Sequence, residues 1–186
     1  MEFKTMLRQS LPLLILCGFG EILAGRVFGG MTAFIEHLPG LIVLIPAIMG
    51  LKGYIDIALG SRLGSAAHMG LISLDDIWNV ESKQNIYASL GLSIIMAVIA
   101  GILAHITLLL LGLHSAGILK LIGIALLAGL LAGAILAFLT VGIILLAFKR
   151  GYDPDNITAP LLATVGDIIA LGCIFATAYL IIEVVP

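Results

Sequence analysis

Three acidic residues, Glu21, Asp56 and Asp167, stand inside long apolar stretches of the sequence. On insertion scales, a charged side chain at the centre of a bilayer costs about 2.5–3.5 kcal/mol, so such groups usually face a water-filled path or a partner. Hard divalent cations prefer oxygen ligands, and Mg²⁺ keeps most of its waters and needs only one or two carboxylates. These three positions therefore predict cation binding within a membrane.

Asp167 is the strongest candidate, because no basic residue lies within one helical turn of it. Ala163 and Thr164 stand four and three residues earlier, on the same face of a helix, and we include Thr164 in the predicted metal site. The alternative is that the Asp167 carboxyl is protonated, or is paired with Lys52 or Arg62 from another helix. The sequence leaves these alternatives open.

Asp56 and Glu21 each allow a structural interpretation beside the functional one. Lys52 stands four residues before Asp56, so the two side chains could form an ion pair on one helical face. Arg26 stands five residues after Glu21, which is too far around an ideal helix for a close pair. Glu21 could therefore serve a pore or couple transport, or it could bind a basic group on another helix, such as Lys52.

The composition indicates that lipid surrounds most of this chain. Of its 186 residues, 61% are hydrophobic and 11% are charged, which is too little polar surface for a soluble domain of this length. The net charge of -2 gives no basic surface for nucleic acid. The sequence has no ATP-binding P-loop, no zinc-protease or serine-hydrolase motif and no cysteine–histidine cluster. We therefore predict neither an enzyme nor catalytic or cofactor-binding residues.

Five apolar segments are long enough to cross a bilayer, which needs about 20 residues. We predict an all-α polytopic membrane protein with a single cation-transport domain over residues 1–186 and no soluble regulatory domain. The second segment contains Pro46 and several glycines, which predicts a kinked or broken helix. The predicted helices cover residues 7–28, 38–69, 85–111, 118–148 and 159–184.

The basic residues of the loops predict the orientation. With five spans, one side of the membrane receives Lys4, Arg8, Lys83, Lys149 and Arg150. Cytoplasmic loops carry an excess of lysine and arginine. We therefore expect a multi-pass protein of the plasma membrane, with its N-terminus in the cytoplasm and its C-terminus outside.

Small residues recur at every fourth position of the fourth segment, at Ala125, Gly129, Gly133 and Ala137. Such a face allows two helix backbones to approach closely in lipid. It could serve packing within one protomer or a contact between protomers. Because a chain of this size builds only a small membrane domain, we also expect a homodimer.

Three stretches resemble signatures of the MgtE-type magnesium transporters and, most closely, of their eukaryotic solute-carrier relatives. Residues 45–53 (IPAIMGLKG) and 61–67 (SRLGSAA) resemble the second helix of that family. Residues 153–167 (DPDNITAPLLATVGD) are similar to the fifth helix, and residues 18–25 (GFGEILAG) resemble the first. The resemblance covers essentially the whole chain as one five-helix unit.

The resemblance implies a dimer in which the second and fifth helices line a central path. It implies that Asp167 is the central cation site and that the backbone carbonyl of Ala163 belongs to the same site. The eukaryotic-type members usually have asparagine and glutamate where this chain has Tyr54 and Asp56. That departure leaves the ion selectivity and the ligands from the second helix open.

The leading hypothesis is therefore transport of hydrated Mg²⁺ through a path between protomers. One alternative is exchange of Mg²⁺ against Na⁺ or H⁺, with Glu21, Asp56 and Asp167 as coupled titrating groups. Another is a membrane assembly protein that transports nothing. That alternative predicts a fixed basic partner for Asp167 and no binding of divalent cations.

Overall fold

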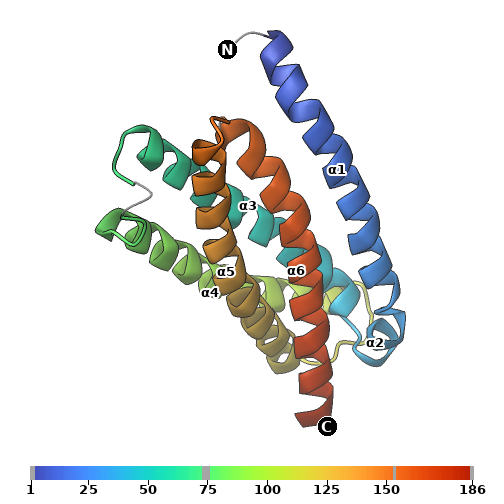
Figure 1. Ribbon diagram of the computed structural model, residues 1–186. Coiled ribbons are helices and arrows are strands. Elements are labelled where there is room, and N and C mark those ends of the chain that lie inside the picture. The colour runs from blue at the N-terminus through green and yellow to red at the C-terminus, as the bar shows by residue number, and fades with distance from the viewer. Residues whose placement is uncertain (1–2, 73–75, 153, 185–186) are drawn as a thin grey trace.

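The computed structural model describes residues 3–72, 76–152 and 154–184, and within these ranges the chain is helical and has no β-strand (Figure 1). Most connections between helices are short, and the helices run back and forth along one bundle. The helices are α1 (Phe3–Gly29), α2 (Thr32–His37), α3 (Leu41–His68), α4 (Val80–Leu110), α5 (Ile118–Lys149) and α6 (Pro154–Val184).

Five of these helices are long and apolar enough to cross a membrane, which confirms the predicted all-α fold with five spans. The one remaining helix in the described ranges, α2, has only six residues and was not predicted. It lies at the turn between α1 and α3. The candidate spans are Ser10–Gly29, Leu41–His68, Val80–Leu110, Ile118–Lys149 and Ile157–Glu183.

The helix boundaries depart from the predicted ones where polar residues extend a helix beyond its apolar run. Helix α4 begins at Val80 rather than near residue 85, because the side chain of Asn79 accepts a hydrogen bond from the Ser82 backbone N–H (2.9 Å). Helix α6 begins at Pro154 rather than near residue 159, since proline fits the first turn of a helix. Pro160 therefore lies inside α6 and does not begin it.

Helix α3 is continuous from Leu41 to His68, with Pro46 in its second turn. A proline removes one backbone hydrogen bond and crowds the preceding turn, but its cost is smaller close to the start of a helix. The continuity of α3 shows that the sequence signal for a break does not interrupt the helix.

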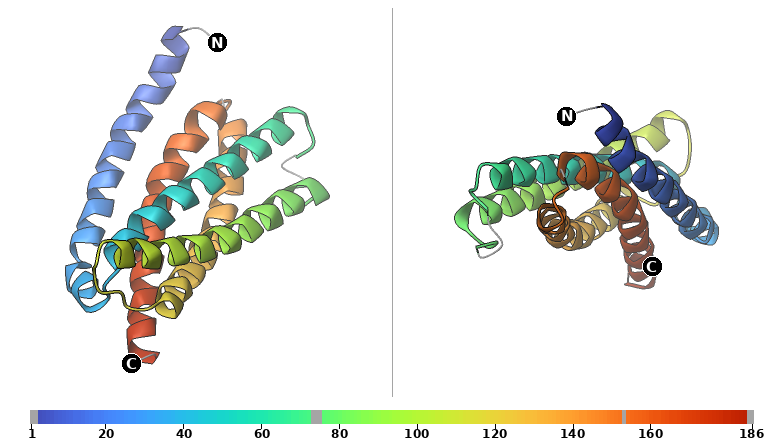
Figure 2. Two further views of the ribbon diagram at one scale, coloured as in Figure 1. Left: turned by 180° about the vertical axis from the view of Figure 1, so that it is seen from behind. Right: turned by 45° about the horizontal axis from the view of Figure 1, so that its top comes forward.

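Helices α3, α4, α5 and α6 form the body of the bundle, and α1 lies against it mainly along α6 (Figure 2). The body has two buried apolar clusters. One lies near α2 and includes Leu44, Ile124 and Ile174, and the other lies toward the C-terminal end of α3 and includes Leu63 and Ile144. Along α3, buried polar residues separate the two clusters.

The small-residue face of α5 is used within the protomer. Ala125, Gly129, Gly133 and Ala137 are all buried. A Cβ atom added at Gly129 would lie 3.5 Å from the Cβ of Ala97 on α4. This face therefore allows α4 and α5 to pack closely, which supports the first of the two interpretations considered for it.

Candidate cation-binding site

Glu21 on α1 and Asp167 on α6 lie close enough for their carboxyl groups to interact with each other. The Asp167 side chain is half-buried in the protomer, and Glu21 is exposed. Both residues lie within candidate membrane spans. The fold therefore brings together two of the predicted metal ligands that are far apart in the sequence.

A line of close contacts between α1 and α6 holds these carboxyl groups opposite each other. The Cys17 thiol donates a hydrogen bond to the Pro160 backbone carbonyl, with 3.5 Å between sulfur and oxygen. One turn farther, a Cβ atom added at Gly20 would lie only 2.3 Å from the Cγ2 methyl of Thr164. The two backbones can approach this closely only because Gly20 has no side chain.

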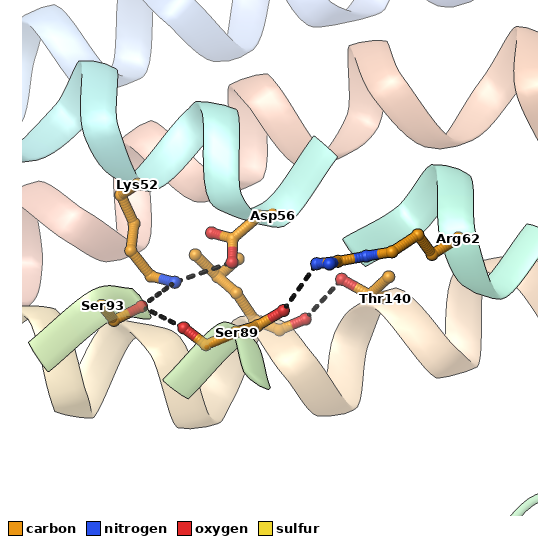
Figure 3. Close-up of polar contacts among 7 residues, drawn as sticks. Lys52, Asp56, Arg62, Ser89, Ser93 and Thr140 are labelled. Atoms are coloured by element: carbon orange, nitrogen blue, oxygen red, sulfur yellow. Dashed lines mark hydrogen bonds and ion pairs between the residues drawn. The ribbon is translucent and has the colours of Figure 1, made fainter. Parts of the chain in front are cut away.

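The two basic residues considered as partners of Asp167 both bind elsewhere (Figure 3). The Lys52 ammonium donates to Asp56 Oδ1 at 2.7 Å, and the Arg62 guanidinium donates to the Ser89 hydroxyl at 3.3 Å. Within the described residues, Asp167 forms no salt bridge. The charged residue that faces Asp167 from α1 is therefore the acidic Glu21.

A facing pair of carboxyl groups has a defined chemistry. Two carboxylates at close range repel each other unless a proton or a cation lies between them. Mg²⁺ is commonly held by one or two carboxylates while it keeps several waters, so this pair matches its requirement. Within the described residues, no group of three or more histidine, cysteine, aspartate or glutamate side chains could form a closed metal cage.

Thr164 and Ala163 occupy the turn of α6 before Asp167. The Thr164 side chain is buried, and its methyl group packs against Gly20. Ala163 is half-buried and carries no polar side chain, so only its backbone carbonyl could bind a cation. Four of the five predicted metal residues, Glu21, Ala163, Thr164 and Asp167, therefore lie along one seam between α1 and α6.

An open groove adjoins this seam between α1 and α3 and has a volume of about 490 Å³. Glu21 borders it, as does Leu171, which lies one turn after Asp167 on α6. Pro46 and Met49 of α3 form the opposite wall. The groove therefore gives the Glu21 carboxyl an opening on the side of the protomer.

Asp56, the fifth predicted metal residue, lies apart from this seam in the core of the bundle. The residue is 1% exposed, and the Lys52 that pairs with it is 4% exposed. Lys52 also lies 3.5 Å from the Ser93 hydroxyl, which in turn donates to the Ser89 backbone carbonyl at 2.9 Å (Figure 3). The second carboxylate oxygen of Asp56 has no hydrogen-bond partner in the part of the chain that the structure describes.

Sequence reasoning missed the serines of this buried layer and the importance of Gly20. Ser89 and Ser93 stand four residues apart on α4, which puts them on one helical face and is the signal that could have found them. Gly20 precedes an intramembrane acidic residue, but nothing in the sequence shows which helix it meets.

Comparison with known proteins identifies the family of this chain. The family described as MgtE, divalent cation transporter, matches residues 45–177, which hold most of α3, all of α4 and α5, and most of α6. This chain belongs to the MgtE family. The match includes Asp56 and Asp167, and Glu21 lies before it.

Among relatives of this MgtE-family chain are vertebrate solute carriers. Solute carrier family 41 member 2 of Xenopus laevis is 32% identical over 181 residues, which cover 90% of this chain and 31% of that protein. The Homo sapiens member 2 is 32% identical over 180 residues, covering 90% and 30%. Member 3 of Rattus norvegicus is 32% identical over 181 residues, covering 91% and 37%. The chain thus spans about a third of the length of these relatives, and the resemblance found in the sequence is confirmed.

Proposed function

We propose that this protein transports divalent cations, most of all Mg²⁺, across the plasma membrane, with Asp167 as its central site. The observation that carries the proposal is an intramembrane carboxyl group that faces a second carboxyl group and forms no salt bridge within the described residues. The family match supports the class of substrate. The arrangement argues against the assembly-protein alternative, which requires a fixed basic partner.

In this mechanism Asp167 and Glu21 attract a hydrated Mg²⁺ and hold it through its waters. The Ala163 carbonyl and Thr164 line the same turn of α6 and offer further oxygens. Because Mg²⁺ loses its waters reluctantly, a site that binds the hydrated ion can also release it. The ion then moves down its gradient without an encoded source of ATP energy.

We propose that the path lies between the protomers of a homodimer, beside α3 and α6. The groove next to Glu21 is open in a single protomer, so a second copy would supply its missing wall. The outward face of α3 is exposed at Pro46, Gly50 and Tyr54, at four-residue spacing. A bend of α3 at Pro46 would adapt this face to the partner. The N-terminus is proposed to lie in the cytoplasm.

Asp56 contributes to this proposal as a second acidic group, which lines the path only after Lys52 has moved away. In the described arrangement its carboxylate is bound by Lys52 inside the bundle. An exchange mechanism remains the second candidate, because two facing carboxyl groups such as Glu21 and Asp167 can share one proton. Measuring Mg²⁺ uptake into liposomes with and without an opposing H⁺ or Na⁺ gradient separates exchange from passive flow.

The central test is Mg²⁺ uptake into proteoliposomes that contain a fluorescent Mg²⁺ indicator. Asp167→Asn should lower the initial uptake rate by about tenfold or more, which corresponds to about 1.4 kcal/mol of lost cation stabilisation. Glu36→Gln is the matched control, because it removes an exposed acidic group on α2 away from the seam. Equal uptake by the wild type and Asp167→Asn would refute the proposed site.

A further inference from the structure

A second groove lies between α4 and α5, on helices that do not contribute to the carboxyl seam, and has a volume of about 210 Å³. Trp78 and Lys83 lie at the end of the groove where α4 begins. Ile86 and Leu90 continue the groove along α4, and Phe138 borders it from α5. One end of the groove is thus aromatic and basic, and the rest is apolar.

The aromatic side chains at the Trp78 end of this groove favour a position at the boundary between lipid and water. The rings of Trp78 and Phe138 meet edge to face, with centroids 5.4 Å apart. Trp78 is 46% exposed and Tyr87, also at the groove, is 69% exposed. Tryptophan and tyrosine concentrate at membrane–water interfaces, where an amphipathic ring contacts both media.

Lys83 gives this mouth an available positive charge. Its side chain is exposed, and within the described residues it forms no salt bridge. The nearby Glu81 carboxylate instead accepts a hydrogen bond from the Asn85 side-chain amide at 3.1 Å. An ammonium group at the membrane surface attracts the phosphate of a lipid headgroup.

The groove below Lys83 has an apolar lining that suits the part of a hydrocarbon chain nearest the headgroup. Seven residues of helix separate Lys83 from Leu90, which is about 10 Å at 1.5 Å per residue. Ala134 and Ala137 on α5 line the same groove, and their small side chains leave the space between the helices open. Since α4 and α5 cross the membrane, lipid is the molecule that meets this surface at the highest concentration.

We propose that this groove binds one anionic phospholipid, with its phosphate at Lys83, its glycerol region beside Trp78 and an acyl chain between α4 and α5. The positive charge selects the lipid by its net negative headgroup, while the apolar walls accept any acyl chain. A bound lipid would hold α4 and α5 together on the surface of the bundle that faces the bilayer. The proposal does not depend on the substrate that the protein transports.

The test uses Trp78, which is the only tryptophan in the chain. The protein is reconstituted in bilayers that mix an unlabelled lipid with a brominated-chain phosphatidylglycerol or phosphatidylcholine, because bromine at contact distance quenches tryptophan fluorescence. We expect the wild type to show about a fivefold preference for phosphatidylglycerol at Trp78, equivalent to about 1 kcal/mol for one interfacial lysine. Lys83→Gln should reduce this preference to about one.

Two further variants separate the headgroup contact from general attraction to the membrane. Lys149→Gln removes an exposed basic residue outside the groove and should keep the wild-type preference. Ala134→Leu fills the groove and should weaken quenching by both brominated lipids. Equal quenching of the wild type by the two lipids, or an unchanged preference in Lys83→Gln, would show that Trp78 meets only ordinary surrounding lipid and would overturn the proposal.

Discussion

The two intramembrane aspartates of this protein occupy opposite electrostatic environments. Asp56 is fully buried and bound by the Lys52 ammonium at 2.7 Å. Asp167 is half-buried, faces the Glu21 carboxyl and forms no salt bridge within the described residues. The comparison teaches that the side chain facing an acidic group, from its own helix or from a neighbouring one, determines whether its charge is neutralised or remains available to a cation.

The neighbour of Asp56 comes from its own helix, whereas the neighbour of Asp167 comes from a helix that is distant in the sequence. Lys52 stands one helical turn before Asp56, so α3 supplies its own counter-charge. Asp167 has no such neighbour on α6, and the approach of α1 at Gly20 brings a second acidic group instead. We therefore expect the Asp56 region to govern stability and the Asp167 region to govern cation binding.

The largest expected effect is a loss of stability when the buried pair is broken. Lys52→Met leaves the Asp56 carboxylate without its counter-charge in the core and should lower the free energy of unfolding by about 3–5 kcal/mol. Thermal unfolding in detergent measures this loss. The double variant Lys52→Met with Asp56→Leu removes both charges and should recover most of the stability. A Lys52→Met protein as stable as the wild type would contradict the assigned pair.

The next effect is stabilisation by the bound ion. A ligand that binds only the folded state at 100 times its Kd stabilises that state by about 2.7 kcal/mol. Added Mg²⁺ should therefore raise the unfolding temperature of the wild type and of the Lys52→Met/Asp56→Leu variant. It should have little effect on Asp167→Asn. Titration with MgCl₂, with an equal ionic strength of choline chloride as control, distinguishes site binding from a general salt effect.

Gly20 allows the seam itself to be tested. Gly20→Ala places a methyl group against the Thr164 methyl and should cost about 1–3 kcal/mol, while also weakening stabilisation by Mg²⁺. Adding Thr164→Ser removes the opposing methyl and should restore both properties. Gly18→Ala is the matched control, because no atom of another described helix lies within 4 Å of the added group. Equal stability and an equal response to Mg²⁺ in the Gly18→Ala and Gly20→Ala variants would mean that α1 does not pack closely on α6.

The smallest effect concerns the repulsion between the two carboxyl groups. Glu21→Gln removes one charge of a partly exposed pair and should stabilise the Mg²⁺-free protein by about 0.5 kcal/mol. The same change should weaken, but not abolish, stabilisation by Mg²⁺, because Asp167 remains. Both quantities come from unfolding curves recorded with EDTA and with Mg²⁺. A Mg²⁺ response identical to that of the wild type would exclude Glu21 from the site.

The sequence was sufficient to predict the five spans, because length and hydropathy alone identify a helix that crosses a bilayer. It also presented the Lys52–Asp56 pair as one of two alternatives, since helical spacing places those residues on one face. The pairing of Glu21 with Asp167 could not be predicted from spacing, because it depends on how α1 packs against a helix at the other end of the chain. The early starts of α4 and α6 were missed because Asn79 acts by capping its helix and Pro154 by fitting the first turn, and neither effect depends on hydropathy.

The attachment of α1 mainly along α6 makes one wall of the carboxyl pair separable from the rest of the bundle. A small tilt of α1 would change the gap between Glu21 and Asp167 while the packed body of α3 to α6 kept its shape. The strength with which the two acidic groups grip an ion could thus be adjusted by moving a single helix, at little cost to the fold.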